Sequence, residues 1–349
     1  MKKFYVGTYT NGESEGIYRL LYDTDRIETS LAAVCESPSY LCLSQTQDVL
    51  YAVKEDTVGG KGSVMAYRIT DNSFELMNQV DTLSQGLVHL VVNQDNTYLF
   101  TVSYEDAQVM MYRLNQDGSV GELTCQRKQE GHSIHPIRQT CAHAHSAWLT
   151  PDESYLCICD LGLDQMVVYE IDYTKGVLEE KSEWKVKFPE GSGPRHMVFH
   201  PQGDHAYLYS ELSCRVYVME YSLQTGFHII QEEKIFTNFN VEEDNDRVTG
   251  AAIRMSQDGN FLYTSNRGED SITLFEVDQK GLIHKKNTIS CEGKHPRDFN
   301  LSEDDTLLLC ANRDSNDITI FERNIISGEL SLIQTISNIS MPIAIIEQP

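Results

Sequence analysis

Residues 195–221 read RHMVFHPQGDHAYLYSELSCRVYVMEY. A short apolar strand leads into a Pro/Gly/Asp turn, a second apolar strand follows, and a polar connection leads to a third strand that ends in an aromatic residue. The same pattern occurs six times along the chain. Equivalent positions in the second strand are Leu50, Leu99, Leu156, Ala206, Leu262 and Leu308, which lie 49, 57, 50, 56 and 46 residues apart. A period near fifty residues indicates a repeat architecture.

A seventh copy is divided between the two ends of the chain. Residues 4–7 (FYVG) resemble its second strand, residues 16–20 (GIYRL) its third and residues 341–346 (MPIAII) its first. A β-propeller protects its strand edges by radial repetition of four-stranded sheets, and a blade shared by both termini closes the ring. We therefore predict an all-β, seven-bladed β-propeller with four-stranded antiparallel blades, formed as a single domain over residues 1–349.

Two common repeat classes fit the sequence less well. WD40 units are about 40 to 45 residues long and carry a Trp-Asp signature, whereas this chain has only Trp148 and Trp184. Kelch repeats have a suitable period, but no Gly-Gly pair recurs from one copy to the next.

The net charge restricts the possible partners. The chain has 28 Lys and Arg residues against 52 Asp and Glu residues, a formal net charge of −24. Such an acidic surface repels phosphate backbones and anionic lipid headgroups, so we expect neither nucleic acid nor membranes as partners. The oligomeric state is left open as a monomer or a weak dimer.

The cysteines and the N-terminus favour a cytoplasmic protein. The nine cysteines are scattered and form no CxxC pair, and Cys157 and Cys159 lie in an apolar strand, where we expect them to be core residues. The N-terminus lacks an apolar leader segment, and no run of apolar residues is long enough to span a membrane.

The predicted blades bring specific residues to one mouth of the ring. In an antiparallel hairpin, the start of the first strand and the end of the second lie at the same edge. At the entrance of the first strand the seven copies place Ser39, Val88, His145, Arg195, Ala251, Arg297 and Ile343. At the exit of the second strand they place Tyr9, Glu55, Tyr104, Leu161, Glu211, Arg267 and Arg313. We expect a mouth that is charged on one side and mainly aromatic and apolar on the other.

Four arginines near one axis of an acidic chain predict a site for a small anion. The alternative is that Arg195, Arg267, Arg297 and Arg313 join neighbouring blades by pairing with Asp160, Asp270, Asp298 and Asp314.

The histidines offer a base rather than a metal site. His143 and His145 face the same side of a strand, but no carboxylate completes a recognisable metal-ligand spacing, so we predict no metal. With an ordinary pKa near neutrality, His145 suits general base catalysis.

Six segments resemble the seven-bladed lactonase propellers, the family of propeller-type 6-phosphogluconolactonases and of carboxy-cis,cis-muconate lactonising enzymes. They are Gly7-Thr8-Tyr9-Thr10, His143-Ala144-His145-Ser146, Asp160-Leu161-Gly162, Gly193-Pro194-Arg195-His196, Ser265-Asn266-Arg267-Gly268 and His295-Pro296-Arg297. The resemblance implies an active site formed by His145, Arg195, Glu211 and Arg267. Ser210 stands where the family commonly has Asn, and we expect it to orient the Glu211 carboxylate; Arg313 stands where the family often has Gln.

The resemblance implies hydrolysis of a sugar lactone, with 6-phosphogluconolactone as the expected substrate and no metal or organic cofactor. We expect His145 or Glu211 to act as the base. The residues expected to contact the substrate are His143, His196, Arg297 and Arg313. Two alternatives stay open at this point: a cycloisomerase that forms a lactone from an unsaturated dicarboxylate, and a non-enzymatic propeller that binds a metabolite or a protein.

Overall fold

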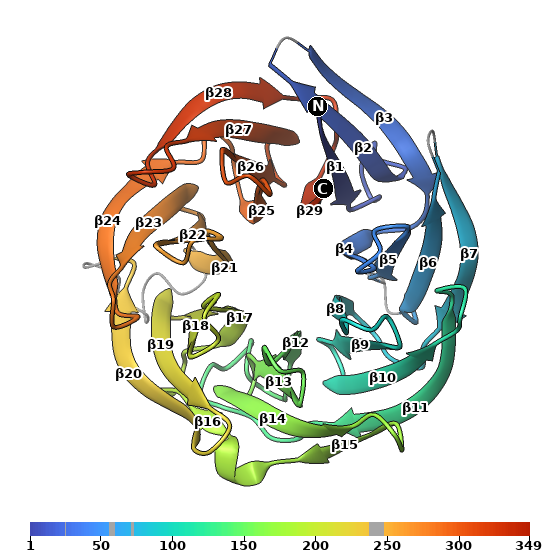
Figure 1. Cartoon of the computed structure of the whole chain (residues 1–349), viewed down its shortest axis with the longest axis vertical. Coiled ribbons are helices and arrows are strands. Elements are labelled where there is room, and N and C mark those ends of the chain that lie inside the picture. The colour runs from blue at the N-terminus through green and yellow to red at the C-terminus, as the bar shows by residue number, and fades with distance from the viewer. Residues whose placement is uncertain (25, 56–59, 71–72, 237–247) are drawn as a thin grey trace.

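The computed structural model describes residues 1–24, 26–55, 60–70, 73–236 and 248–349, which form seven antiparallel sheets arranged in a ring (Figure 1). Consecutive stretches of the chain form neighbouring blades. The last strand, β29, pairs with β1, so that one blade takes strands from both termini. The predicted all-β, seven-bladed propeller with a shared closing blade is therefore confirmed.

Each blade runs outward from the axis of the ring. The innermost strands are β4 (Pro38–Leu43), β8 (Leu87–Val92), β12 (Ala144–Leu149), β17 (Pro194–Phe199), β21 (Thr249–Met255), β25 (Pro296–Leu301) and β29 (Pro342–Gln348). The second strands are β1 (Lys2–Thr8), β5 (Val49–Lys54), β9 (Tyr98–Ser103), β13 (Tyr155–Asp160), β18 (His205–Ser210), β22 (Phe261–Arg267) and β26 (Leu307–Asn312).

Two further strands complete every blade. The third strands are β2 (Gly16–Asp23), β6 (Ser63–Ile69), β10 (Gln108–Leu114), β14 (Gln165–Asp172), β19 (Arg215–Ser222), β23 (Ser271–Val277) and β27 (Asp317–Arg323). The outermost strands are β3 (Arg26–Val34), β7 (Phe74–Asp81), β11 (Val120–Lys128), β15 (Val177–Glu180), β20 (Gly226–Lys234), β24 (Ile283–Ser290) and β28 (Leu330–Ile336). One blade departs from the four-stranded pattern, because the short 3-10 helix η1 (Ser182–Trp184) leads into an additional strand β16 (Val186–Lys187), which pairs with β14.

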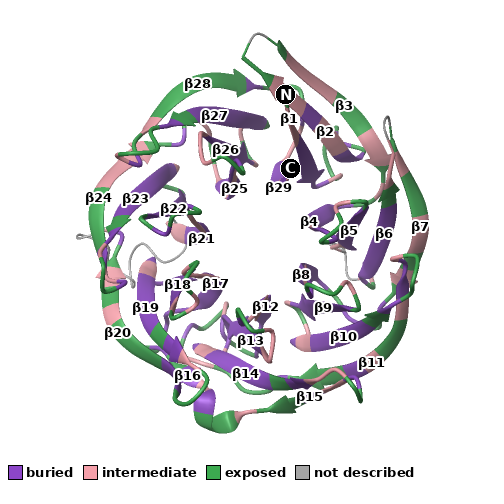
Figure 2. Ribbon diagram, viewed as in Figure 1, coloured by how far each residue is buried: buried purple, intermediate pink, exposed green. Residues whose placement is uncertain are grey.

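Burial decreases from the axis to the rim (Figure 2). Every residue of β9 and β26 is buried, because each blade packs against a neighbour on both faces. Strands that are covered on both faces are apolar at nearly every position instead of alternating, which explains the continuous apolar runs of the repeat. The outermost strand β28, in contrast, exposes most of its side chains. Cys157 and Cys159 are fully buried, as expected for core residues.

The first turn of six blades has the same backbone conformation despite different residues. In the turn after β17, the Gly203 N–H donates to His200 O at 2.8 Å, and Gly203 has φ +79°. The residues at this left-handed position are Gln47, Asn96, Glu153, Gly203, Gly259 and Asp305. Glycine adopts this conformation without strain, but only two of the six copies use it. The turn is thus set by the hairpin that surrounds it as much as by its own residue.

Strand β29 closes the ring by pairing antiparallel with β1 along most of its length. It pairs with β1 from Lys3 opposite Gln348 to Thr8 opposite Pro342, and the Tyr5 hydroxyl donates to Gln348 Oε1 at 2.6 Å. Ile343 and Ile345 are buried in this blade.

Removal of residues 341–349 is expected to open the ring. The deletion exposes the inner edge of β1 and the apolar surfaces that β29 covers, and unpaired strand edges promote aggregation. We expect a lower and less cooperative thermal transition by circular dichroism and aggregates in size-exclusion chromatography. Deletion of the exposed Pro349 alone is the control. A truncated chain that melts like the full-length protein would contradict the closure argument.

Candidate active site

An irregularity at the start of each innermost strand places residues at the mouth of the ring. Strand β12 pairs Ala144 with Asp160 and Ser146 with Cys159, which leaves His145 unpaired in a β-bulge. Similar register shifts occur in the other six blades. The residues at these shifts are Ser39, Val88, His145, Arg195, Ala251 with Ala252, Arg297 and Ile343. A bulge bends the strand and redirects a side chain. The side chains of these residues therefore do not follow the regular alternation between the two faces of the sheet.

A cavity of about 700 Å³ opens at this mouth. Its ionisable lining residues are Tyr9, Glu55, Tyr104, Glu105, Arg138, His145, Glu211, Arg267, His295 and Arg297. Most residues predicted from the strand entrances and exits therefore meet at one place. The predicted aromatic and apolar side is wrong, because Glu55, Glu105 and Arg138 bring charge to it.

The carboxylate of Glu211 is the centre of the site. Its Oε2 atom lies 3.1 Å from Arg195 Nε and 2.9 Å from Arg267 Nη2. Its Oε1 atom accepts a hydrogen bond from Arg138 Nη2 at 2.5 Å. Glu211, which follows the end of β18, is thus held by guanidinium groups from three parts of the chain.

These contacts fix the charge of the cluster. Burial alone would raise the pKa of the Glu211 carboxyl, but Arg267, Arg138 and Arg195 outweigh burial and hold this pKa well below its usual range. Burial and the neighbouring Arg267 lower the pKa of Arg195 to about 9, which leaves its guanidinium charged at neutral pH. A carboxylate whose oxygens already accept charge-assisted hydrogen bonds is a weak proton acceptor.

His145 lies against the same carboxylate but stays neutral. Its Nε2 atom is 3.7 Å from Glu211 Oε2, which is too long for a direct hydrogen bond. Burial, with Arg195 beside the ring, lowers the pKa of His145 well below its usual value. The imidazole therefore has a free lone pair at neutral pH.

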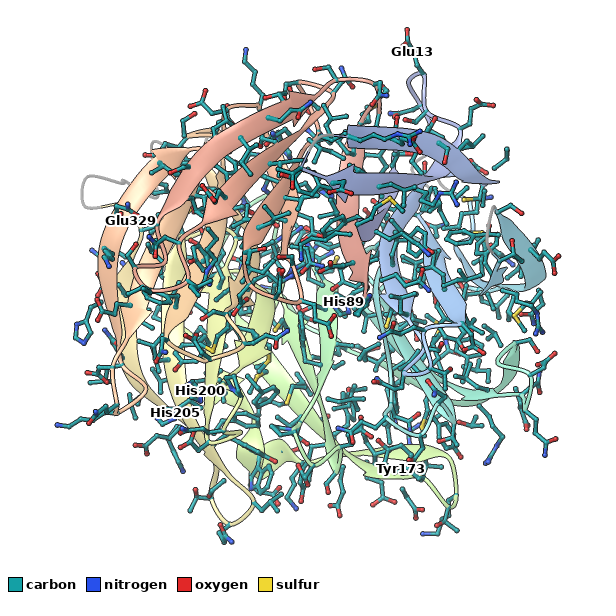
Figure 3. The ribbon with its side chains drawn as sticks, turned by 45° about the horizontal axis from the view of Figure 1, so that its top comes forward. Glu13, His89, Tyr173, His200, His205 and Glu329 are labelled. Carbon is teal, nitrogen blue, oxygen red and sulfur yellow. The ribbon has the colours of Figure 1, made fainter. Side chains whose placement is uncertain are left out.

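The structure does not bring His143 and His196 to the cavity wall. The His143 ring stacks on Tyr104 with centroids 4.2 Å apart, and its Nδ1 lies 2.7 Å from Tyr104 O. His196 packs beneath the cavity between His145 and His89, whose rings are 5.5 and 5.6 Å away. Figure 3 shows His89 near the centre of the ring and the turn residues His200 and His205 well away from it.

The two remaining arginines differ in position. Arg297 lines the cavity, where its guanidinium carbon lies 5.3 Å from the centre of the Tyr9 ring and its Nη2 is 3.8 Å from Glu55. Arg313 does not line the cavity, and its Nε donates to Asp314 Oδ1 at 2.6 Å. Arg313 thus pairs with an aspartate of its own blade, and neither Arg313 nor Arg297 forms the expected blade-linking pair with an aspartate.

Two expectations about partners need correction. Asp298 pairs with Arg254 rather than with Arg297, because the bulge turns the Arg297 side chain into the cavity. The Ser210 hydroxyl contacts Ser213 and Arg215 and does not orient Glu211. Arg138, which the sequence analysis missed, holds the free side of that carboxylate.

Arg138 lies on residues 129–143, the connection between β11 and β12. Most other connections between blades are short, such as residues 82–86 and 291–295. The spacing of 57 residues between Leu99 and Leu156, the longest of the five spacings, was the available signal for this insertion.

Among the described residues, no group of three or more His, Cys, Asp or Glu side chains is arranged to hold a metal ion. His143 and His145 therefore gain no third ligand there. The absence of a metal stays a prediction.

Comparison with known proteins defines the family. The family model described as Lactonase, 7-bladed beta-propeller, matches residues 3–346. The chain belongs to this family. Its activity is therefore that of a lactonase, a hydrolase of cyclic esters, and the non-enzymatic alternative falls away.

Individual relatives are similar to this lactonase along almost its whole length. A 6-phosphogluconolactonase of Bacillus subtilis is 34% identical over 348 residues, which cover 98% of this chain and 97% of the relative. A crystal structure of a Lactobacillus plantarum protein has a TM-score of 0.92 with 31% identity and covers 100% of both chains. The structure of a periplasmic gluconolactonase of Pseudomonas aeruginosa has a TM-score of 0.91 with 29% identity and covers 99% of this chain and 98% of its own.

The neutral imidazoles below the cavity predict that acid destabilises this lactonase. An unfolded histidine takes up a proton near pH 6.5, whereas burial, with Arg254 nearby, lowers the pKa of His89 well below that value. The unfolded chain then binds more protons, so stability falls as the pH drops below about 6.5, by about 1.4 kcal/mol per pH unit for each such group. We expect His89→Phe to lose less Tm between pH 7 and pH 5 than the unsubstituted protein.

Differential scanning calorimetry at a series of pH values measures this difference. Burial raises the pKa of Asp160 to about 7, so protonation of this carboxyl makes the native state more stable as the pH falls. Asp160 is present in both proteins, so its contribution cancels when their Tm values are compared. An equal loss of Tm in both proteins would show that His89 does not stay neutral in the native state.

Proposed function

We propose that this lactonase hydrolyses 6-phosphogluconolactone to 6-phosphogluconate. The observation that carries the proposal is a neutral imidazole, His145, beside a carboxylate and guanidinium groups in a cavity that suits a small anionic sugar. The similarity to the 6-phosphogluconolactonase of Bacillus subtilis supports the choice of substrate. No described feature favours the cycloisomerase alternative.

His145 is the better candidate for the base. Attack on a lactone carbonyl requires a group that accepts a proton from water. The pKa of each group is lowered, so the choice depends on which atoms are free to accept a proton. Both Glu211 oxygens already accept from guanidinium groups, whereas the neutral His145 ring keeps an acceptor nitrogen. In the proposed step, water gives its proton to His145 Nε2, and its oxygen forms the bond to the carbonyl carbon. Glu211 holds the guanidinium groups in place and stabilises the imidazolium that results.

Arg267 is the candidate for stabilising the carbonyl oxygen. It lines the cavity, and Glu211 Oε2 and the Gly250 carbonyl fix its Nη2 group. A donor that is already fixed in place stabilises a developing oxyanion without the cost of reorganisation. Arg195, which lies behind Glu211 and donates to Ala251 O at 2.7 Å, keeps the cluster rigid. Collapse of the tetrahedral intermediate breaks the ring C–O bond, and the proton on His145 goes to the leaving ring oxygen.

Arg297 is the candidate for the phosphate, since it lines the cavity outside the Glu211 cluster. Substrate contacts by His143, His196 and Arg313 stay predictions that the geometry does not favour. The lack of a cofactor, the single-domain organisation, the excluded partners and the oligomeric state also stay predictions.

We propose the cytoplasm as the compartment, on the basis of the nine free cysteines and the Bacillus relative. In the described part of the chain, no helix is long and apolar enough to cross a membrane.

The reaction is tested by a panel of sugar lactones, with and without a 6-phosphate, measured against the buffer blank. We expect turnover above the blank and a decrease of about 10²- to 10⁴-fold in kcat for His145→Asn, the usual range for loss of a general base. The acid limb of the pH profile is expected well below 6.5, because the lowered pKa keeps His145 neutral there. His200→Asn, on the opposite face, is the matched control. A variant that retains full turnover would remove His145 from the mechanism.

The phosphate assignment is tested by Arg297→Ala. A charge-assisted hydrogen bond contributes about 1.5 to 3 kcal/mol, so its loss is expected to lower kcat/KM about ten- to a hundredfold. The decrease is expected only for the phosphorylated lactone. Equal decreases for both lactones would mean that Arg297 acts on the reacting centre or on the fold, and no decrease would leave it as a partner of Glu55.

A further inference from the structure

We infer that Arg138 is a specificity residue that binds the phosphate of the substrate from the side of the cavity opposite Arg297. This inference rests on the proposed function. The sequence pattern did not indicate it, because Arg138 belongs to no strand of the repeat.

Arg138 is the most exposed of the three arginines that line the cavity. Its side chain is 32% exposed, against 15% for Arg297 and 8% for Arg267. Its Nε and Nη2 groups contact the Tyr104 hydroxyl, and Nη2 also donates to Glu211. Among the described residues, its Nη1 group has no hydrogen-bond partner. One edge of a fixed guanidinium therefore remains for a bound anion.

Arg138 also lies away from the proposed reacting centre. The two oxygens of the Glu211 carboxylate contact different groups. Oε2 faces His145 and Arg267, whereas Oε1 accepts a hydrogen bond from Arg138. Arg138 is therefore on the other side of the carboxylate from the candidate base and the candidate oxyanion donor. It is placed to hold a part of the substrate that does not react.

Hydrogen bonds within the connection between β11 and β12 hold the backbone of Arg138 in place. The N–H of Arg138 donates to His135 Nδ1 at 3.0 Å. The next residue, Gln139, is fully buried and donates to Asp164 Oδ1 at 2.7 Å. The same carboxylate accepts the N–H groups of Gly191 and Gly193. A binding residue held in this way loses little conformational entropy when a ligand arrives.

The lining carries Arg138, Arg267 and Arg297 against Glu55, Glu105 and Glu211, and the charge of Glu211 is already compensated by its arginine partners. Arg138 and Arg297 lie about half a turn apart around the ring, on the connection between β11 and β12 and on β25. Both long side chains line the same cavity, and a guanidinium group suits the recognition of a phosphate. The nearby Glu105 opposes an anion, but it is exposed, so water and salt screen its charge.

The test compares Arg138→Gln with the unsubstituted lactonase on phosphorylated and unphosphorylated lactones. We expect KM for the phosphorylated lactone to rise about ten- to a hundredfold relative to KM for the unphosphorylated lactone, the effect of one charge-assisted contact. Because Arg138 is also a partner of Glu211, any decrease in kcat is expected to be equal for the two lactones. Ile137→Ala is the matched control, because Ile137 is adjacent, 71% exposed and absent from the cavity wall. Equal rises in KM for both lactones, or no rise for either, would overturn the inference.

A double substitution adds a second criterion. If Arg138 and Arg297 hold the same phosphate, the effects of Arg138→Gln and Arg297→Ala on the phosphorylated lactone are not additive. Additive effects would overturn the shared contact.

Binding measurements separate this inference from the proposed function. Calorimetric titration with 6-phosphogluconate and with gluconate requires no turnover. If the protein hydrolyses neither lactone but loses affinity for 6-phosphogluconate on Arg138→Gln, the reaction is wrong and the phosphate contact holds. If it hydrolyses the phosphorylated lactone and Arg138→Gln binds 6-phosphogluconate unchanged, only the inference on Arg138 is wrong. No binding of 6-phosphogluconate by the unsubstituted protein would overturn both.

Discussion

One unpaired residue at the start of an innermost strand is the constraint on which the site depends. A strand that kept its regular alternation would point every second side chain toward one neighbouring blade. The bulges in β12, β17 and β25 interrupt that alternation at His145, Arg195 and Arg297. Because the same bulge recurs around the ring, the propeller offers a set of equivalent positions at the mouth. Three of these positions carry ionisable side chains, and the other four are occupied by Ser39, Val88, Ala251 with Ala252, and Ile343.

The charged groups at the mouth determine one another's protonation states. Glu211 stays ionised because guanidinium groups surround it, and burial, together with the charge of Arg195, keeps His145 neutral. A single carboxylate in this place therefore organises both the cations and the base. In a chain of net charge −24, this local excess of arginine focuses the attraction for small anions on one cavity.

The sequence predicted the ring and much of the mouth because both follow from the repeat. Copies of one hairpin place equivalent residues at equivalent points, so His145, Glu211, Arg267 and Arg297 are found by alignment within the chain. Features outside the repeat could not be predicted by aligning its copies. Arg138 lies on an insertion, and its contact with Glu211 joins parts of the chain that no local pattern relates. Pairings across the cavity, such as Arg297 with Glu55, depend on side-chain reach rather than on strand register.

The shared blade also sets an order of events during synthesis. Strands β1, β2 and β3 leave the ribosome first, but β29, which completes their sheet, is made last. At about 5 to 20 residues per second, a chain of this length takes roughly 20 to 70 s to translate. Throughout that interval the first sheet lacks its inner strand. The cavity takes Tyr9 from the first sheet and Arg297 from the last full blade, so a nascent chain passes through its whole synthesis without a binding site.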